Sequence, residues 1–196
     1  MTEKIISMYI TMMPVILAGI LNMIVVKQSW FKKYAKPIDR NTRLKDGKRI
    51  FGDNKTGLGI FTMILCSIVT HVFWGLLCRI WSYGQLSNKL YIQYENTIIY
   101  NIAVGILMGL AYMIFELPNS FIKRRLDIPD GKTVKGIKGS TFFLVDQLDS
   151  MFGVILVLKI LSNITWLQYI HYVMLGGLTH IAVNLILYKL KIRRNL

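Results

Sequence analysis

Five separate stretches of this 196-residue chain are almost free of charge and about as long as the hydrocarbon core of a bilayer is thick. Because a helix rises about 1.5 Å per residue, about 20 apolar residues are enough to cross that core. Only 17% of the residues are charged, against about 25% in soluble domains. The pattern predicts an all-α integral membrane protein whose five transmembrane helices cover approximately residues 5–26, 57–81, 98–117, 141–161 and 165–188.

The first of these stretches has the position of a signal peptide but not its features. Its apolar run exceeds the roughly 7–15 residues of a signal peptide's hydrophobic region, and no small-residue cleavage site follows. We therefore interpret it as a retained span. Since no internal repeat and no second domain are evident, we expect residues 1–196 to form a single membrane-embedded domain.

The formal charge of +14 lies almost entirely on one side of the predicted bundle. Residues 27–56 hold ten Lys or Arg, residues 118–140 hold six and the tail from residue 189 holds four, whereas the opposite side has only Lys4 and Lys89. The positive-inside rule places the N-terminus outside, and the C-terminus and two large basic loops, 27–56 and 118–140, in the cytosol of a cell-membrane protein. Nucleic-acid binders can be as basic, but such long apolar runs exclude that class.

The most informative polar residues are Asp146 and Asp149, at the cytosolic start of the fourth span. Residues at i and i+3 share a helix face, about 5–6 Å apart, so the two carboxylates repel each other. Each costs about 2–3 kcal/mol near the bilayer, and the helix N-terminus recovers only about 0.3–1 kcal/mol. A bound divalent cation would resolve this conflict. The alternative is that both carboxylates lie solvated at the interface and stabilise the start of the helix.

Glu116 ends the third span at the same predicted depth. Three carboxylates at one depth could form an oxygen-ligand site for Mg²⁺. Ser120 and Lys123 would share a face with Glu116 if the helix continued, but we expect Pro118 to prevent an uninterrupted helix.

The first basic loop contains Asp46-Gly-Lys-Arg-Ile-Phe-Gly-Asp-Asn-Lys-Thr56. Its glycines let backbone amides approach an anion, and the loop lacks the Lys-Ser/Thr pair of a P-loop. The alternative is that the cations only set topology and attract anionic lipids. That alternative does not explain the glycine and aspartate pattern, so we predict substrate phosphate binding by Lys48, Arg49, Asp53 and Lys55.

Three motifs therefore follow one another: the first-loop segment, Ser120-Phe-Ile-Lys-Arg124, and Asp146-Gln-Leu-Asp149. With the five-span topology, they resemble the CDP-archaeol synthase family of the CTP-transferase superfamily, which is related to phosphatidate cytidylyltransferase. The resemblance covers most of residues 36–150. It implies that Asp146 and Asp149 are the metal ligands, and that Ser120 and Lys123 are the functional Ser and Lys of the second motif. That family usually has Gly-Asp before this Ser, where this chain has Phe115-Glu116.

The resemblance implies transfer of CMP from CTP to a membrane lipid phosphate, giving CDP-lipid (CDP-archaeol or similar) and pyrophosphate. Mg²⁺ held by Asp146, Asp149 and Glu116 would neutralise the triphosphate. Lys123 and Arg124, with Lys48, Arg49 and Lys55, would hold the phosphates in line. The attacking phosphate monoester has its second pKa near about 6, so no catalytic base is required. The expected partners are CTP and the lipid phosphate at the cytosolic face, and a homodimer is left open.

Two alternatives remain at this stage. A diacylglycerol phosphate in place of the ether lipid would make the chain a phosphatidate cytidylyltransferase that forms CDP-diacylglycerol. A different class, a non-enzymatic organic-anion transporter, would also carry polar residues within its spans. Against the transporter, the chain has no inverted repeat, and its charged residues gather at one face instead of the midplane.

Overall fold

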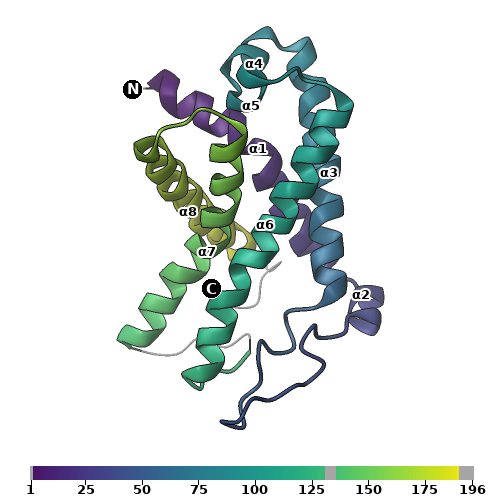
Figure 1. Cartoon of the computed structure of the whole chain (residues 1–196), viewed down its shortest axis with the longest axis vertical. Coiled ribbons are helices and arrows are strands. Elements are labelled where there is room, and N and C mark those ends of the chain that lie inside the picture. Colours follow the sequence, from purple (N-terminus) through teal and green to yellow (C-terminus); the bar gives the residue numbers. More distant parts are fainter. Residues whose placement is uncertain (1, 131–135, 190–196) are drawn as a thin grey trace.

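A computed structural model describes residues 2–130 and 136–189 of the chain (Figure 1). These residues form α1 (Thr2–Val25), α2 (Ser29–Tyr34), α3 (Gly57–Ile80), α4 (Ser82–Ser87), α5 (Lys89–Gln93), α6 (Ile98–Arg125), α7 (Ile137–Leu161) and α8 (Trp166–Lys189). Five of them, α1, α3, α6, α7 and α8, are long and apolar enough to cross a membrane. The prediction of an all-helical protein with five spans is confirmed.

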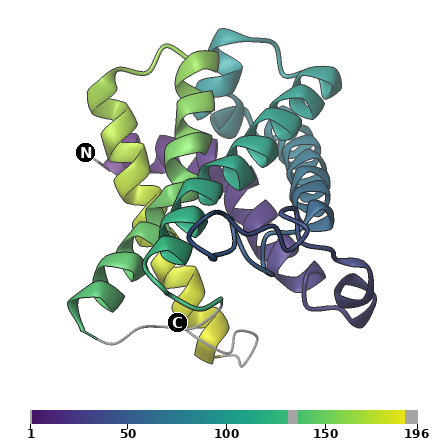
Figure 2. The ribbon, with the colours of Figure 1, turned by 60° about the horizontal axis from the view of Figure 1, so that its bottom comes forward.

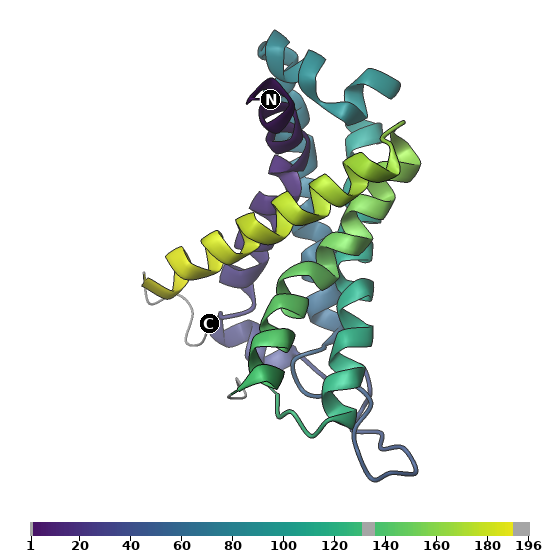
Figure 3. The same ribbon diagram turned by 90° about the vertical axis from the view of Figure 1, so that its left-hand side faces the viewer.

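The long helices pack in the order α1, α3, α6, α7 and α8, each against the next (Figure 2). The last helix leaves this row and crosses α1 obliquely (Figure 3), where the Tyr9 hydroxyl lies 3.2 Å from Thr179 Oγ1. Between the helices lies a core that includes Met63, Met108 and Leu158. Loop 35–56, the end of α6 and the start of α7 lie at one end of this bundle, and α4 and α5 lie at the other (Figure 1).

Glycines on α6 and α7 let the central helices approach closely. A Cβ on Gly105 would lie 2.6 Å from Ile68 Cα, and one on Gly109 would lie 2.8 Å from Ile64 Cα. Gly153 of α7 would similarly bring a Cβ to 2.7 Å from the Ala111 carbonyl oxygen of α6. Small residues at helix contacts are the usual way for membrane helices to pack. Through these contacts α6 packs closely against α3 on one side and α7 on the other, and its last turns face α7.

The prediction that Pro118 breaks the third span is wrong. Helix α6 continues through Pro118 to Arg125, and Pro118 faces outward. A proline inside a helix removes one hydrogen bond, which a membrane helix tolerates when its neighbours hold it in place. The second basic loop is therefore shorter than 118–140. It runs from residue 126 to 136, and its residues 131–135, like the tail from residue 190, lie outside the described part of the chain.

The first loop is organised by the buried carboxylate of Asp39. Asp39 accepts hydrogen bonds of 3.0 Å from the backbone amides of Phe51 and Gly52, and pairs with the Arg49 guanidinium at 2.6 Å. Burial alone would raise the pKa of Asp39, but the Arg49 guanidinium and the backbone amides outweigh it and hold that pKa well below its usual range. Asp39 thus fixes the path of the loop that leads to Lys55.

Candidate active site

Asp146 and Asp149 of α7 face one amide group on α6. Asn119 Nδ2 donates to Asp146 Oδ1 at 2.6 Å and to Asp149 Oδ2 at 2.7 Å. Asn119 is buried, with 7% of its surface exposed. A single neutral group therefore bridges the two carboxylates, and the predicted sharing of a helix face by Asp146 and Asp149 is confirmed.

Two lysines stand beside this pair. The Lys123 ammonium donates to both carboxylate oxygens of Asp146, and the Lys55 ammonium forms an ion pair with Glu116. Burial alone would lower the pKa of Lys55, but the carboxylate of Glu116, helped by Asp149 and Asp146, raises that pKa above its usual value. Lys55 therefore carries its positive charge next to the three acids.

We predicted that the carboxylates of Glu116, Asp146 and Asp149 form one Mg²⁺ site. In the structure they do not form a preformed group of ligands. Among residues 2–130 and 136–189, no three His, Cys, Asp or Glu side chains form a group that could hold a metal ion. Glu116 instead binds Lys55, because the loop held by Asp39 brings that lysine to the end of α6. Asp146 and Asp149 alone fit a hard divalent cation. They offer carboxylate oxygens on one helix face, close enough for one atom to touch both.

The other predicted phosphate ligands lie in a network that joins the first loop to the end of α6. Lys48 donates to the Arg125 carbonyl oxygen and to Asp127, both at 2.7 Å. Arg49 pairs with Asp39 and Asp53. Arg124 pairs with Asp130 at 2.7 Å, and Asp130 also accepts from the Asp53 amide at 3.1 Å. We call this network the loop clasp; it consists of Asp39, Asp46, Lys48, Arg49, Asp53, Arg124, Arg125, Asp127 and Asp130.

The structure thus divides the predicted residues into two groups at the same end of the bundle. Lys55, Glu116, Lys123, Asp146 and Asp149 meet in one cluster, whereas Lys48, Arg49, Asp53 and Arg124 belong to the loop clasp. Because α6 continues through Pro118, Ser120 lies one residue beyond Asn119 on this helix. Its side chain makes no polar contact with another residue in the described part of the chain.

Sequence reasoning missed Asn119, Asp39 and Asp130. Asn119 stands three residues after Glu116 and four before Lys123, so helical spacing alone would have placed it on their face. The assumption that the helix stops at Pro118 hid this signal. Asp39 and Asp130 belong to no recognisable local motif. The guanidinium that pairs with Asp39 lies ten residues further along the chain, and the Asp53 amide that donates to Asp130 lies 77 residues before it.

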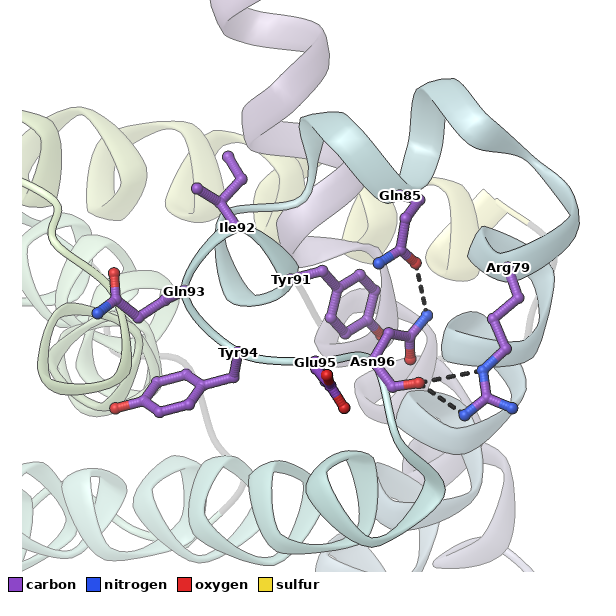
Figure 4. Close-up of a pocket in the computed structure, with 8 residues that line it drawn as sticks. All are labelled: Arg79, Gln85, Tyr91, Ile92, Gln93, Tyr94, Glu95 and Asn96. Carbon is purple, nitrogen blue, oxygen red and sulfur yellow. Dashed lines mark hydrogen bonds between the residues drawn. The ribbon is translucent and has the colours of Figure 1, made fainter.

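A hollow lies at the opposite end of the bundle and is not part of this cluster. Its volume is about 540 Å³, and its lining includes Arg79, Tyr91, Glu95 and Asn96 (Figure 4). Helix α6 separates it from Asn119 by roughly 30 Å, given its rise of about 1.5 Å per residue. Arg79 donates to the Asn96 carbonyl oxygen at 2.6 Å, so this arginine fastens the loop before α6.

Known proteins similar to this chain share one description. A family model described as CarS-like, CDP-archaeol synthase, matches residues 2–195. A CDP-archaeol synthase of Saccharolobus islandicus is 32% identical over 164 residues, covering 83% of this chain and 82% of the relative. A CDP-archaeol synthase of Methanoculleus marisnigri is 32% identical over 163 residues, covering 80% of this chain and 87% of the relative.

A solved structure gives the same fold. It is that of an intramembrane enzyme for archaeal membrane lipid biosynthesis, and it has a TM-score of 0.62 and 23% identity over 90% of this chain and 92% of that one. The family match across residues 2–195 and the relatives at 32% identity agree with the motifs around Ser120 and Asp146. This chain therefore belongs to the CDP-archaeol synthase family of enzymes.

Proposed function

We propose that this enzyme transfers CMP from CTP to a membrane lipid phosphate of the archaeol type. An oxygen of the lipid phosphate attacks the α-phosphorus of CTP, the bond from that phosphorus to the β-phosphate oxygen breaks, and CDP-lipid and pyrophosphate form. The observation that carries the proposal is the Asp146–Asp149 pair, held by one buried amide and flanked by Lys123 and Lys55.

The chain's own residues supply binding and charge. Lys123 and Lys55 present ammonium groups to the triphosphate, and Ser120 offers a hydroxyl on the same helix. Glu116 positions Lys55. The loop clasp orders the segment that delivers Lys55, because its ion pairs fasten the first loop to the end of α6. Asp146 and Asp149 would hold Mg²⁺, which when bound neutralises phosphate charge and assists departure of pyrophosphate.

The site's depth suits a reaction between a lipid and a soluble nucleotide. The cluster lies at the bundle end that carries the basic loops (Figure 1), so we place it at the cytosolic face, with the N-terminus outside. The Asp146–Asp149 and Ser120–Arg124 motifs support membership of the wider CTP-transferase superfamily. A single catalytic domain and a homodimer stay predictions.

A labelled-substrate assay tests the reaction. Purified protein in nanodiscs is mixed with Mg²⁺, CTP labelled at the α-phosphate, and either archaeol phosphate or a diacylglycerol phosphate. We expect label in CDP-lipid, equimolar pyrophosphate, faster turnover of the ether lipid, and loss of product with EDTA that excess Mg²⁺ restores.

The control is Asp146→Asn, which should remain folded and make no product above background. Faster turnover of the diacylglycerol phosphate would mean that the enzyme forms CDP-diacylglycerol instead of a CDP-ether lipid. Absence of CDP-lipid with both lipids, from protein that melts cooperatively, would overturn the proposed reaction.

A further inference from the structure

The amide group of Asn119 is only half satisfied. Its nitrogen donates to both carboxylates, whereas its buried oxygen, Oδ1, has no hydrogen-bond partner within the described residues. A buried acceptor without a partner destabilises the folded protein, because it has lost its hydrogen bonds to water without replacing them. A group in this state beside two acids indicates a second arrangement in which that oxygen is used.

The distances around Asn119 match the edges of a metal coordination sphere. Mg²⁺ holds its ligands in an octahedron at about 2.0–2.1 Å, so oxygens on neighbouring corners lie about 3 Å apart. Asn119 Nδ2 lies 2.6 Å from Asp146 Oδ1 and 2.7 Å from Asp149 Oδ2. Rotation of the amide by about 180° exchanges its nitrogen and oxygen. The oxygen then stands within a few tenths of an ångström of an octahedral edge to each carboxylate.

We propose that Asn119 is the third protein oxygen ligand of the magnesium site, reached by this amide rotation. Without the ion, the NH₂ group faces the two acids and offsets their repulsion. With the ion, the oxygen faces inward, so Asn119 takes the place that the sequence had given to Glu116. This inference rests on the proposed function only for the identity of the ion.

The two possible roles of Asn119 predict opposite changes in ion affinity when its amide is removed. If the amide only clamps the acids, it competes with a cation, and its removal leaves ion affinity unchanged or increases it. If the amide oxygen is a ligand, its removal weakens ion binding even though the competing donor is gone. An aspartate at this position keeps the oxygen ligand but adds a third carboxylate, which repels its neighbours when no ion is bound.

Ion binding is measured without CTP or lipid phosphate, so that no turnover enters. The full chain in detergent is titrated with Mn²⁺, followed by electron paramagnetic resonance, and its melting temperature is recorded in EDTA and in Mg²⁺. We expect Asn119→Ala to raise the Mn²⁺ dissociation constant about tenfold or more, and to abolish the stabilisation by Mg²⁺. Asn119→Asp should restore ion binding while melting below wild type in EDTA.

The matched control is Asn184→Ala. Asn184 is also a buried asparagine whose Oδ1 has no hydrogen-bond partner in the described part of the chain, but its amide nitrogen donates to Gln147 instead of an acid. It should lose stability with an unchanged Mn²⁺ dissociation constant. Unchanged or tighter Mn²⁺ binding by Asn119→Ala would overturn the ligand role. Wild-type protein that binds no ion yet makes CDP-lipid would also overturn it, and would leave the reaction itself standing.

Discussion

Asp39 in the first loop and Asp149 in α7 are two acids with opposite surroundings. Asp39 faces a guanidinium and accepts from three backbone amides, those of Asn41, Phe51 and Gly52. Asp149 accepts only from neutral donors, the Asn119 side chain and the Ser150 amide, and no cation lies at ion-pair distance among the described residues. Asp39 is thus fully compensated, and Asp149 is not.

The difference separates structural acids from functional ones. A buried carboxylate with a matched cation and several amide donors fixes the local conformation, because the loss of either charged partner would leave the other buried and uncompensated. A carboxylate that shares one amide with a second acid leaves negative charge available for a ligand. On this basis we infer that the loop clasp shapes the site, and we propose Asp146, Asp149 and Asn119 as its metal-binding centre.

The largest expected effect is that of Asp149→Asn. Loss of this carboxylate removes a predicted metal ligand, and we expect the rate of CDP-lipid formation to fall by about a hundredfold to a thousandfold. Because repulsion with Asp146 is also removed, the variant should melt at or above the wild-type temperature in EDTA. Labelled-CTP turnover and thermal unfolding, measured on the same preparation, check both parts. A rate near wild type, or a clearly lower melting temperature, would contradict the view that Asp149 serves function whereas Asp39 serves structure.

The main features of the fold were predictable because they depend on local chemistry. Five apolar runs of bilayer length dictate five helices, and the i and i+3 spacing of Asp146 and Asp149 dictates a shared face. The cluster's remaining geometry depends on contacts between distant segments. Lys55 meets Glu116 across 61 positions, and that pairing follows from the path of a loop that Asp39 fixes through Arg49.

Pro118 shows where a local rule misleads in a membrane protein. In water, an internal proline ends or kinks a helix at a cost of about 3 kcal/mol or more. In α6, the proline faces outward while the next residue, Asn119, bonds two acids on α7. These tertiary contacts hold the final turns in helical form, so the site depends on residues beyond the point where the sequence predicts an end.

The next effect in size is that of Asp39→Asn on stability. The substitution leaves Arg49 without its principal partner, and breaking such a buried pair costs about 3 kcal/mol. Since the pKa of Asp39 is held below its usual value, its stabilising effect is complete above about pH 4 and is lost as the pH falls towards the lowered pKa. Denaturant unfolding at pH 7 should show this loss.

The control for Asp39 is Asp53→Asn, which removes an exposed partner of the same arginine. The Asp53 side chain is 70% exposed, so its loss should cost less than about 1 kcal/mol. Equal costs for the two substitutions would contradict the view that Asp39 organises the loop.

The smallest expected difference is in the stability cost of substituting two glycines of the first loop. Gly47 and Gly52 have φ angles of 74° and 105°, which disfavour any side chain. A Cβ on Gly47 meets nothing within 4 Å, whereas one on Gly52 collides with the Asp130 carboxylate that Arg124 and the Asp53 amide hold in place. Gly47→Ala should cost about 1 kcal/mol, and Gly52→Ala about 2–3 kcal/mol.

Unfolding of the two glycine variants, compared with Gly52→Ala in an Asp130→Ala background, isolates the collision. Removal of the Asp130 carboxylate should recover about 1 kcal/mol of the Gly52→Ala cost, because only backbone strain then remains. Additive costs in the double variant would mean that Asp130 does not press on Gly52. The clasp would then hold the loop through its ion pairs alone, including that of Arg125 at the end of α6 with Asp46, and not through a contact between Asp130 and Gly52.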